Sequence, residues 1–156
     1  MVSSALEAKL SHNKQVVLDM IAAINAKDMQ AFASFLHERA EFVQMVQREL
    51  ESSGLHGGIL NLKGRNAIVD AQTVFNDLAS EVSWRVLNIA EADNGTVFTE
   101  RVDRFKLNEQ WMELRVVGSM DVVGGKIVRW RDYWDHEEGE YQFRKVGLKL
   151  GQIGID

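Results

Sequence analysis

The sequence contains neither cysteine nor proline among its 156 residues. Without cysteine the chain can form no disulfide, no thiol nucleophile and no cysteine-ligated metal centre. It also has no run approaching the roughly 20 apolar residues of a membrane-spanning helix, so we expect no membrane association. The first ten residues lack the apolar core of a secretory signal, and we therefore expect a cytoplasmic protein.

A basic surface is lacking as well. The chain has 18 lysines and arginines against 23 aspartates and glutamates, a net charge of -5. Because nucleic-acid affinity depends on clustered cations, we expect no nucleic-acid partner. The four histidines show no metal-ligand spacing, so we expect neither a metal nor another cofactor. The length fits one domain over residues 1–156, with no repeat or linker inside it.

Apolar residues in the first third of the chain recur at helical spacing. One set at i, i+3, i+4 and i+7 predicts an amphipathic helix: Val17, Met20, Ile21 and Ile24. Asp28 can cap a second short helix. Residues 41–47 look extended, residues 48–63 read as a long glycine-rich loop, and residues 66–80 predict a third helix.

From residue 82 onward the pattern changes to strands separated by tight turns. Asn94-Gly95 is a strong hairpin signal, and Asn108-Glu109 and Gly124-Gly125 mark two further connections. Four antiparallel strands are therefore expected to run to about residue 135, followed by a charged tail over residues 136–156. The order helix–helix–strand–helix–meander predicts an α+β fold with helices packed on one sheet.

Alternation along the last strand identifies its inward face. One face carries an acid among large apolar residues: Val128, Trp130, Asp132 and Trp134. These neighbours place Asp132 inward. A two-residue loop at Gly124-Gly125 would turn this face outward, whereas a three-residue loop or a bulge sets Asp132 opposite Gly118. We therefore predict a longer loop or a bulge.

Turn geometry places an arginine and a second acid on the same inward face. A two-residue turn at Asn108-Glu109 sets Asp103 opposite Leu114. The same turn sets Arg101 opposite Val116.

The hairpin at Asn94-Gly95 extends this face to a further strand. A two-residue turn at Asn94-Gly95 sets Asn88 opposite Arg101. It also sets Val86 opposite Asp103.

This register brings two acids and one arginine within reach of one another. Asp132 lies two strands from Arg101 and Asp103, about 9.6 Å away at about 4.8 Å per strand, and Gly118 leaves the path open. One guanidinium with five donors can hold both carboxylates. The plainer interpretation is an exposed structural ion pair. Burial of charge on an apolar face costs several kcal/mol per ion, however, and such clusters are enriched at functional sites.

Two carboxylates in different environments can divide the roles of acid and base. An ionised Asp132 would take a proton from water while a protonated Asp103 gives one to an epoxide oxygen, with no metal or cofactor required. The surrounding inward residues would suit a hydrophobic substrate and form the predicted pocket: Trp84, Val86, Leu114, Val116, Gly118, Trp130 and Trp134.

Two motifs, TERVD at Thr99–Asp103 and GGKIVRWRDYWD at Gly124–Asp135, flank the inward Gly118. This arrangement resembles the limonene-1,2-epoxide hydrolase family. The resemblance implies an Asp–Arg–Asp triad in which Asp103 is the acid and Asp132 the base. The order of elements resembles the wider ketosteroid-isomerase and polyketide-cyclase superfamily. That implies a strongly curved, mixed or antiparallel sheet wrapped around helices to form a cone-shaped pocket.

One feature departs from the family pattern. The family orients its water with a tyrosine and an asparagine two residues apart on the first strand, and the matching residues here are Phe42 and Gln44. Gln44 can hydrogen-bond a water, but Phe42 has no hydroxyl. A polar residue of the 48–63 loop could replace it, or both side chains could simply fill the pocket wall. Asn88 is a further candidate for positioning water or substrate.

Two other functions stay open from the sequence. A related cyclase or isomerase would use a hydroxyl of the substrate as nucleophile and would need no oriented water. A non-catalytic binding module is the other, because this fold often serves as a scaffold. The resemblance also implies a homodimer, for which outward apolar residues on the sheet would be suited.

Overall fold

The structure, a computed structural model, describes residues 10–45 and 60–148 of the chain. Within these residues it contains four helices and six strands: α1 (His12–Asn25), α2 (Met29–Ser34), β1 (Leu36–Gln44), β2 (Leu60–Lys63), α3 (Arg65–Leu78), β3 (Glu81–Glu91), β4 (Val97–Leu107), β5 (Gln110–Val123), β6 (Lys126–Tyr133) and α4 (His136–Lys145). None of these helices is long and apolar enough to cross a membrane.

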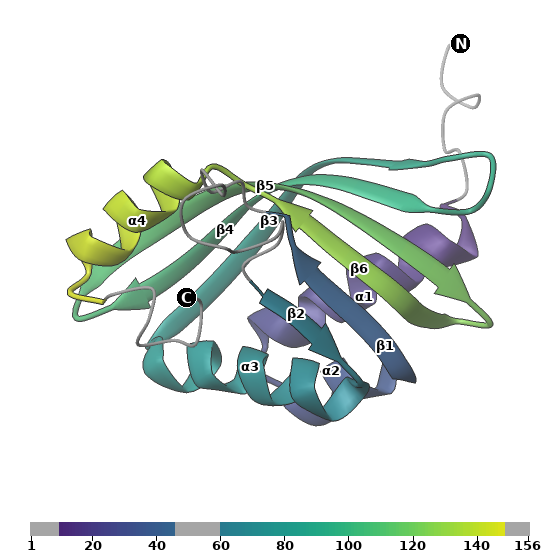
Figure 1. The fold of residues 1–156 in the computed structure, drawn as a ribbon, viewed down its shortest axis with the longest axis horizontal. Helices are drawn as coiled ribbons and strands as arrows, with labels where there is room; N and C mark the ends of the chain where they lie inside the picture. Colours follow the sequence, from purple (N-terminus) through teal and green to yellow (C-terminus); the bar gives the residue numbers. More distant parts are fainter. Residues whose placement is uncertain (1–9, 46–59, 149–156) are drawn as a thin grey trace, which may run out of the picture.

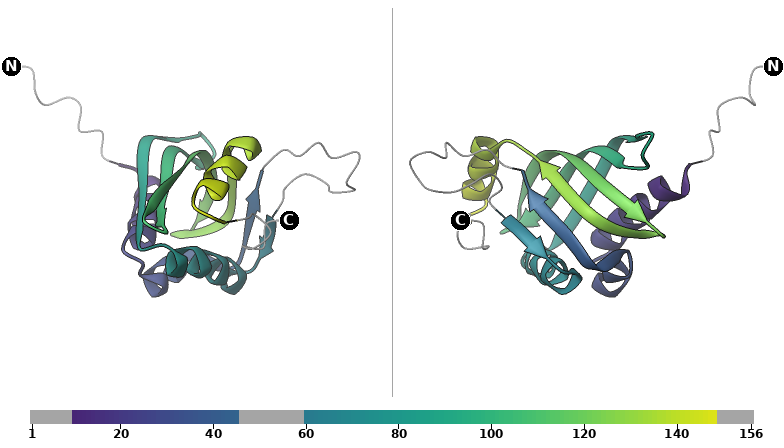
Figure 2. Two further views of the ribbon diagram at one scale, coloured as in Figure 1. Left: turned by 90° about the vertical axis from the view of Figure 1, so that its left-hand side faces the viewer. Right: turned by 45° about the vertical axis from the view of Figure 1, so that its right-hand side comes forward.

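The strands form a single curved sheet with the spatial order β2-β1-β6-β5-β4-β3. Strands β3 to β6 are an antiparallel meander, whereas β1 runs parallel to β6 and antiparallel to β2. The sheet arches over α1, α2 and α3, and α4 lies over one end of the hollow (Figures 1 and 2). The predicted α+β fold, a curved mixed sheet around helices, is confirmed.

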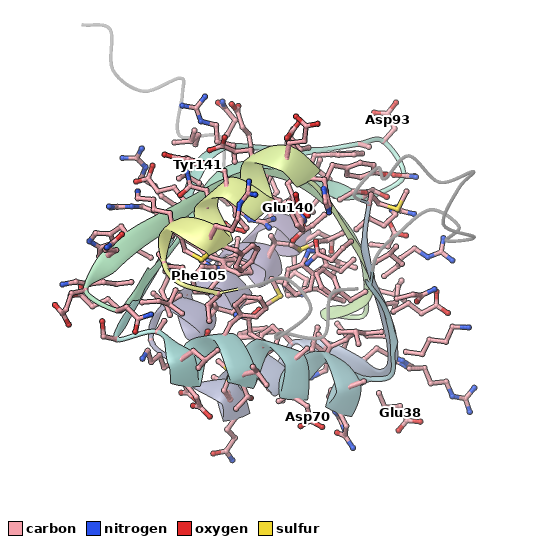
Figure 3. All side chains as sticks on the ribbon, turned by 60° about the vertical axis from the view of Figure 1, so that its left-hand side comes forward. Glu38, Asp70, Asp93, Phe105, Glu140 and Tyr141 are labelled. Carbon is pink, nitrogen blue, oxygen red and sulfur yellow. The ribbon has the colours of Figure 1, made fainter. Side chains whose placement is uncertain are left out.

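Helical periodicity and capping account for the first two helices. The four residues of the predicted α1 stripe are all buried in the core: Val17, Met20, Ile21 and Ile24. The Asp28 side chain accepts a hydrogen bond of 2.9 Å from the Ala31 amide, as predicted for the cap of α2. Figure 3 shows Phe105 pointing into the hollow while the labelled acids Glu38, Asp70 and Asp93 project outward.

Residues with positive φ fix the turn between β4 and β5. Asn108 and Glu109 have φ values of 49° and 62°, the combination that a two-residue type I′ turn requires. The turn sets Asp103 opposite Leu114 and Arg101 opposite Val116. This pairing confirms the predicted register. A type I′ turn suits it because the twist of the turn matches the right-handed twist of the strands.

A glycine turn and a bulge together set the register between β5 and β6. Gly124 and Gly125 have φ values of 57° and 75° and form a two-residue turn. The pairing then shifts between Asp121 and Val122, and beyond that shift Gly118 lies opposite Asp132. The bulge keeps the tryptophan-rich face of β6 inward, so this prediction is also confirmed.

The predicted register between β3 and β4 was wrong, because the loop at Asn94-Gly95 is one residue longer than a two-residue turn: Glu91 pairs with Val97 rather than with Phe98. A second bulge follows Val86, which lies opposite Arg101 rather than Asp103; Trp84 lies opposite Asp103 instead. Beyond the bulge Asn88 lies opposite Glu100, on the outer face, and donates a hydrogen bond of 2.7 Å to that side chain. Asn88 is therefore exposed and is not placed to position water or substrate in the pocket.

Three further segments differ from the expected pattern. β1 begins at Leu36, five residues before the expected strand, and the end of the expected 48–63 loop forms β2. The charged tail begins as α4, with Asp135 as its cap, acids in the first turn and bases in the last turn. These charges favour a helix through its dipole, a signal that the tail already carried. The remaining parts of the loop and tail lie outside the described residues.

Candidate active site

One buried arginine joins two buried carboxylates on the concave face of the sheet. Arg101 Nε lies 2.9 Å from Asp103 Oδ1, and Arg101 Nη2 lies 2.9 Å from Asp103 Oδ2. The same Nη2 donates a hydrogen bond of 2.8 Å to Asp132 Oδ2 on β6. The arginine side chain is fully buried and each carboxylate side chain is 5% exposed. The bridging predicted from strand spacing is present.

Gly118 on β5 makes this bridge sterically possible. A Cβ atom at Gly118 would lie 2.4 Å from Arg101 Nη1 and 2.9 Å from Asp132 Oδ1. Real Cβ contacts are not so short, so any side chain there would displace the guanidinium. The glycine therefore provides the space through which Arg101 reaches across β5.

Three neighbouring side chains fix the orientation of the cluster. Thr99 Oγ1 accepts a hydrogen bond of 3.1 Å from Arg101 Nη1, and Trp130 Nε1 donates one of 2.7 Å to Asp132 Oδ1. The Arg101 guanidinium carbon also lies 4.9 Å from the centre of the Trp84 ring, in a cation–π contact. The donors and acceptors are thus held before any ligand binds, which is the preorganisation that acid–base chemistry requires.

Burial and neighbouring charges shift the pKa values of Asp103 and Arg101 from their ordinary values. Desolvation raises the pKa of Asp103 from 3.8 to about 6, against the opposing pull of the Arg101 guanidinium. Burial disfavours the charge of Arg101, but the two carboxylates outweigh it and raise the pKa of Arg101. Asp103 therefore holds a proton at a pH where a surface aspartate has lost it, whereas Arg101 stays charged.

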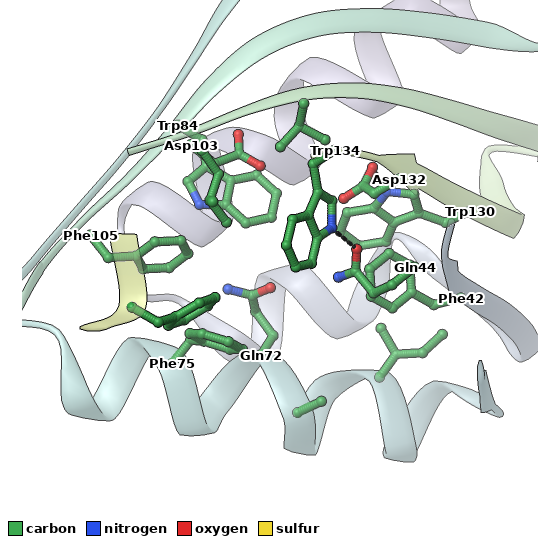
Figure 4. Close-up of a pocket in the computed structure, with 15 residues that line it drawn as sticks. Phe42, Gln44, Gln72, Phe75, Trp84, Asp103, Phe105, Trp130, Asp132 and Trp134 are labelled. Atoms are coloured by element: carbon green, nitrogen blue, oxygen red, sulfur yellow. Dashed lines mark hydrogen bonds between the residues drawn. The ribbon is translucent and has the colours of Figure 1, made fainter. Parts of the chain in front are cut away.

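A pocket of about 630 Å³, counted to its open mouth, lies between the sheet and α3 (Figure 4). Both carboxylates line it. So do five of the seven residues predicted for the pocket wall: Trp84, Leu114, Val116, Trp130 and Trp134. Val86 lies opposite Arg101 and Gly118 lies opposite Asp132, but Val86, Gly118 and Arg101 do not line the pocket. Most of the lining side chains are apolar, which suits a small, mostly apolar ligand.

One side of the pocket, built mainly by α3, was not predicted from the sequence. Residues of α3, the end of β4 and α4 line the pocket there: Ile68, Ala71, Gln72, Phe75, Phe105 and Phe143. The four α3 residues follow i, i+3, i+4, i+7 spacing, a pattern that predicts a face packed against the rest of the domain. The polar Gln72 within that stripe was the signal that could have marked the site.

Phe42 and Gln44 on β1 also line the pocket. Gln44 pairs with Asp132 across the parallel β1–β6 ladder, so the two side chains are neighbours. Trp134 Nε1 donates a hydrogen bond of 2.6 Å to Gln44 Oε1, drawn as the dashed line in Figure 4. An indole nitrogen can only donate, so Gln44 Oε1 accepts this bond, and the Gln44 Nε2 group has no acceptor among the described residues. Phe42 packs on Trp130 at 4.4 Å between ring centres.

The chemistry available here is proton transfer. One acid with a raised pKa and a second carboxylate share a pocket wall, while a permanent cation holds them both. Within the described residues, no three histidine, aspartate or glutamate side chains converge in a way that could hold a metal ion.

Comparison with known proteins indicates the family to which the chain belongs. A sequence profile of the limonene-1,2-epoxide hydrolase catalytic domain matches residues 11–139. A search of curated protein sequences finds no match.

Several solved structures share the fold at low identity. An LEH-like epoxide hydrolase from M. tuberculosis has a TM-score of 0.68 at 18% identity, over 86% of this chain and 91% of that one. A Bacillus subtilis protein of inferred isomerase activity has a TM-score of 0.68 at 19% identity, over 86% and 91%. A protein with a ketosteroid isomerase-like fold from Catenulispora acidiphila has a TM-score of 0.67 at 14% identity, over 88% and 95%.

These structural similarities establish the fold expected from the resemblance to the ketosteroid-isomerase superfamily. The profile match covers most of the chain, from Ser11 in front of α1 to Gly139 in α4, and includes every residue of the Asp103–Arg101–Asp132 cluster. The chain belongs to the limonene-1,2-epoxide hydrolase family.

Proposed function

We propose that this protein is a cofactor-independent epoxide hydrolase that adds water to a hydrophobic cyclic or terpene-like epoxide and gives a vicinal diol. The observation that carries the proposal is the single guanidinium bound to two buried carboxylates, both of which line an apolar pocket. Burying an arginine and two carboxyl groups costs free energy that pairing only partly offsets, so the arrangement is better explained by chemistry than by stability.

Asp132 acts as the base in this proposal. Its two oxygens accept hydrogen bonds from Arg101 and Trp130, and each oxygen keeps a second lone pair for a water. One N–H of the Gln44 amide donates to one lone pair of this water, and the other lone pair is left to attack the substrate carbon. Gln44 thereby serves in the water-orienting role that the family resemblance assigned to it, without a hydroxyl at Phe42.

Asp103 acts as the acid. Its raised pKa keeps a proton available for the epoxide oxygen. As the water oxygen bonds to one epoxide carbon, the bond between this carbon and the epoxide oxygen breaks. Asp132 takes a proton from the water, and Asp103 gives one to the departing epoxide oxygen. The product is a neutral diol, and the proton gained by Asp132 returns to Asp103 before the next turnover. Arg101 keeps its charge throughout and holds both acids.

Hydrolysis in H₂¹⁸O tests the reaction directly. Incubation with cyclohexene oxide or a monocyclic terpene epoxide is expected to give a diol with one ¹⁸O atom, detected by mass spectrometry. Asp132→Asn removes the base and is expected to lower kcat/KM by about a thousandfold. The matched control is Asp121→Asn, which makes the same change on the neighbouring strand, where Asp121 pairs with Arg131.

The outcomes separate the possibilities. Labelled diol with loss of turnover in Asp132→Asn alone supports the proposal. Undiminished turnover in Asp132→Asn would reject Asp132 as the base. Binding of the epoxide without turnover under any condition would instead indicate a binding module.

A second candidate rests on Phe42. Because that side chain offers no hydroxyl to hold a water, an epoxide-opening cyclase or isomerase, whose nucleophile is a hydroxyl of the substrate, fits the same acid and base. Such an enzyme would convert an epoxy alcohol into a cyclic ether or an isomer that contains no ¹⁸O. The labelling experiment, repeated with an epoxy alcohol as substrate, therefore distinguishes the two candidates.

A further inference from the structure

Gln72 is a polar residue in the otherwise apolar stripe that α3 presents to the pocket. It shares that stripe with Ile68, Ala71 and Phe75, and all four line the pocket. A buried or half-buried amide in such a stripe costs free energy unless its polar atoms are used. Figure 4 shows the Gln72 amide pointing into the pocket from the helix, whereas the side chains of Asp103 and Asp132 enter from the sheet on the other side.

A buried asparagine fixes which end of this amide faces the pocket. Asn76, 2% exposed, donates a hydrogen bond of 3.2 Å from Nδ2 to the carbonyl oxygen of Ile24. Its Oδ1 atom must therefore be the end that faces Gln72, and it accepts a hydrogen bond of 3.0 Å from Gln72 Nε2. Because the amino end of Gln72 is held by Asn76, the carbonyl end is the one left over.

The Gln72 Oε1 atom is thus an oriented acceptor. Among the described residues it accepts no hydrogen bond. The residues beside it on the helix face are apolar, so the described part of the chain provides no donor for it there. Gln44 on β1 is the reverse case: its Oε1 accepts from Trp134, and its amino group has no acceptor among the described residues. The pocket therefore carries a donor on β1 and a separate acceptor on the facing wall.

We propose that Gln72 Oε1 accepts a hydrogen bond from a hydroxyl group of the substrate, at a position remote from the epoxide ring. This rests on the proposed function and narrows its substrate class from hydrophobic epoxides in general to hydroxylated ones. The acids hold the epoxide at the sheet, and the carbon skeleton spans the apolar middle of the pocket to reach α3. A neutral hydroxyl fits better than an ammonium group, because no acidic side chain lines the α3 wall: Ile68, Ala71, Gln72 and Phe75.

Two epoxides of equal size test the acceptor. One is cyclohexene oxide with a hydroxymethyl group on ring carbon 4, and the other carries an ethyl group there. The wild-type chain is expected to favour the hydroxymethyl compound in kcat/KM by about fivefold to tenfold relative to the ethyl compound, the worth of one neutral hydrogen bond. In Gln72→Leu the preference should disappear or reverse, mainly through KM for the hydroxymethyl compound.

The matched control is Gln15→Leu, the same change at a glutamine of α1 that bonds Asp19 on the surface. It should keep the wild-type preference. Gln72→Leu fits the apolar stripe but leaves the buried Asn76 Oδ1 atom without its donor, which lowers the thermal stability; the variant is still expected to fold. Gln72→Met is a second variant with the same prediction and a closer shape. Circular dichroism and thermal unfolding check both.

A binding measurement keeps this test separate from the proposed function. Calorimetry with the two corresponding diols should show the same preference in Kd for wild type and its loss in Gln72→Leu, whether or not any epoxide is turned over. Equal Kd values and equal kcat/KM values for the two ligands in the wild-type chain would overturn the role of Gln72. If no epoxide is hydrolysed but the Kd values still show a preference that depends on Gln72, the hydrolase proposal alone is overturned.

Discussion

Each face of β4 carries an arginine paired with an acid, but one pair is buried and the other is exposed to solvent. On the concave face Arg101 pairs with Asp103, with side chains that are 0% and 5% exposed. On the convex face, three residues further on, Arg104 Nε lies 2.8 Å from Glu113, with side chains that are 36% and 51% exposed. The distances are alike, so distance does not distinguish the two pairs.

Solvent makes the difference. Water already stabilises the charges of the outer pair, and such a pair contributes about 0–1 kcal/mol to stability. The inner charges have lost that hydration, and removal of one partner costs about 3–5 kcal/mol because it strands the others. Burial also shifts the pKa of Asp103, which gives the inner cluster a proton to donate. An ion pair on a strand is therefore informative about function only when its face is known.

The largest expected effect comes from a change of arginine to lysine on each face. Arg101→Lys leaves one ammonium that cannot reach both carboxylates, so we expect kcat/KM to fall by about a thousandfold. The free energy of unfolding should fall by about 3 kcal/mol, measured by urea denaturation. Arg104→Lys is the matched change on the outer face, and both quantities should stay near wild type. Equal losses in the two variants would contradict the contrast between the faces.

A methyl group at Gly118 breaks the inner cluster without removing a charge. Gly118→Ala forces the Arg101 guanidinium away from its position 2.4 Å from the new Cβ. We expect about a hundredfold loss of kcat/KM and about 1–3 kcal/mol of destabilisation. Ser119→Ala, the next residue and on the other face, should change kcat/KM by less than about threefold. A crystal structure of Gly118→Ala with the Arg101 bridge unchanged would disprove this account.

The raised pKa of Asp103 predicts a pH dependence of both activity and stability. Above about pH 6 the acid loses its proton, so kcat/KM should fall about tenfold per pH unit. The folded state binds this proton more tightly than the unfolded chain does. The free energy of unfolding should therefore decrease as pH rises from the ordinary value of 3.8 through about 6, and then level off.

Asp103→Asn provides the control for this pH dependence. The amide cannot titrate, so this contribution to stability should be absent in denaturation curves measured between pH 4 and pH 7.5. Persistence of the full wild-type dependence in the variant would assign it to another group.

The smallest catalytic effect is expected on the outer face, where we propose a homodimer interface. Three large apolar residues are exposed there, Phe98, Val117 and Tyr133, each 42–46% exposed. Val117 and Tyr133 are direct cross-strand partners. Val117→Lys should convert a dimer into a monomer in sedimentation velocity, while kcat/KM changes by about twofold or less. A wild-type chain that sediments as a monomer at micromolar concentration would end this proposal.

Much of the inward face could be predicted because its determinants are local. Period-two alternation identified the apolar side of β6, and the turn residues Asn108-Glu109 and Gly124-Gly125 fixed the registers on either side of β5. Those turns require positive φ, which few residues adopt, so the sequence marks them clearly. From these turns followed the placement of Arg101, Asp103 and Asp132 on one face.

The failures have a common physical origin. The loop at Asn94-Gly95 holds one residue more than a two-residue turn, and this alone sets Asn88 opposite Glu100 on the outer face. The bulge after Val86, which contains no glycine or proline, then shifts the pairing again and sets Trp84 opposite Asp103. Asn25 at the end of α1 also holds that strand, through hydrogen bonds to both the amide and the carbonyl of Trp84. Nothing within the strand itself records this distant partner.

The sequence by itself therefore determined the strand faces, the two tight turns and the acid–arginine–acid set, because each depends on residues close together in the chain. Only the tertiary structure decided that β1 lies parallel to β6, which brings Gln44 beside Asp132, and that α3 faces the sheet with Gln72 in its apolar stripe. Those contacts join segments that are tens of residues apart, and their energies come from packing that no local pattern encodes.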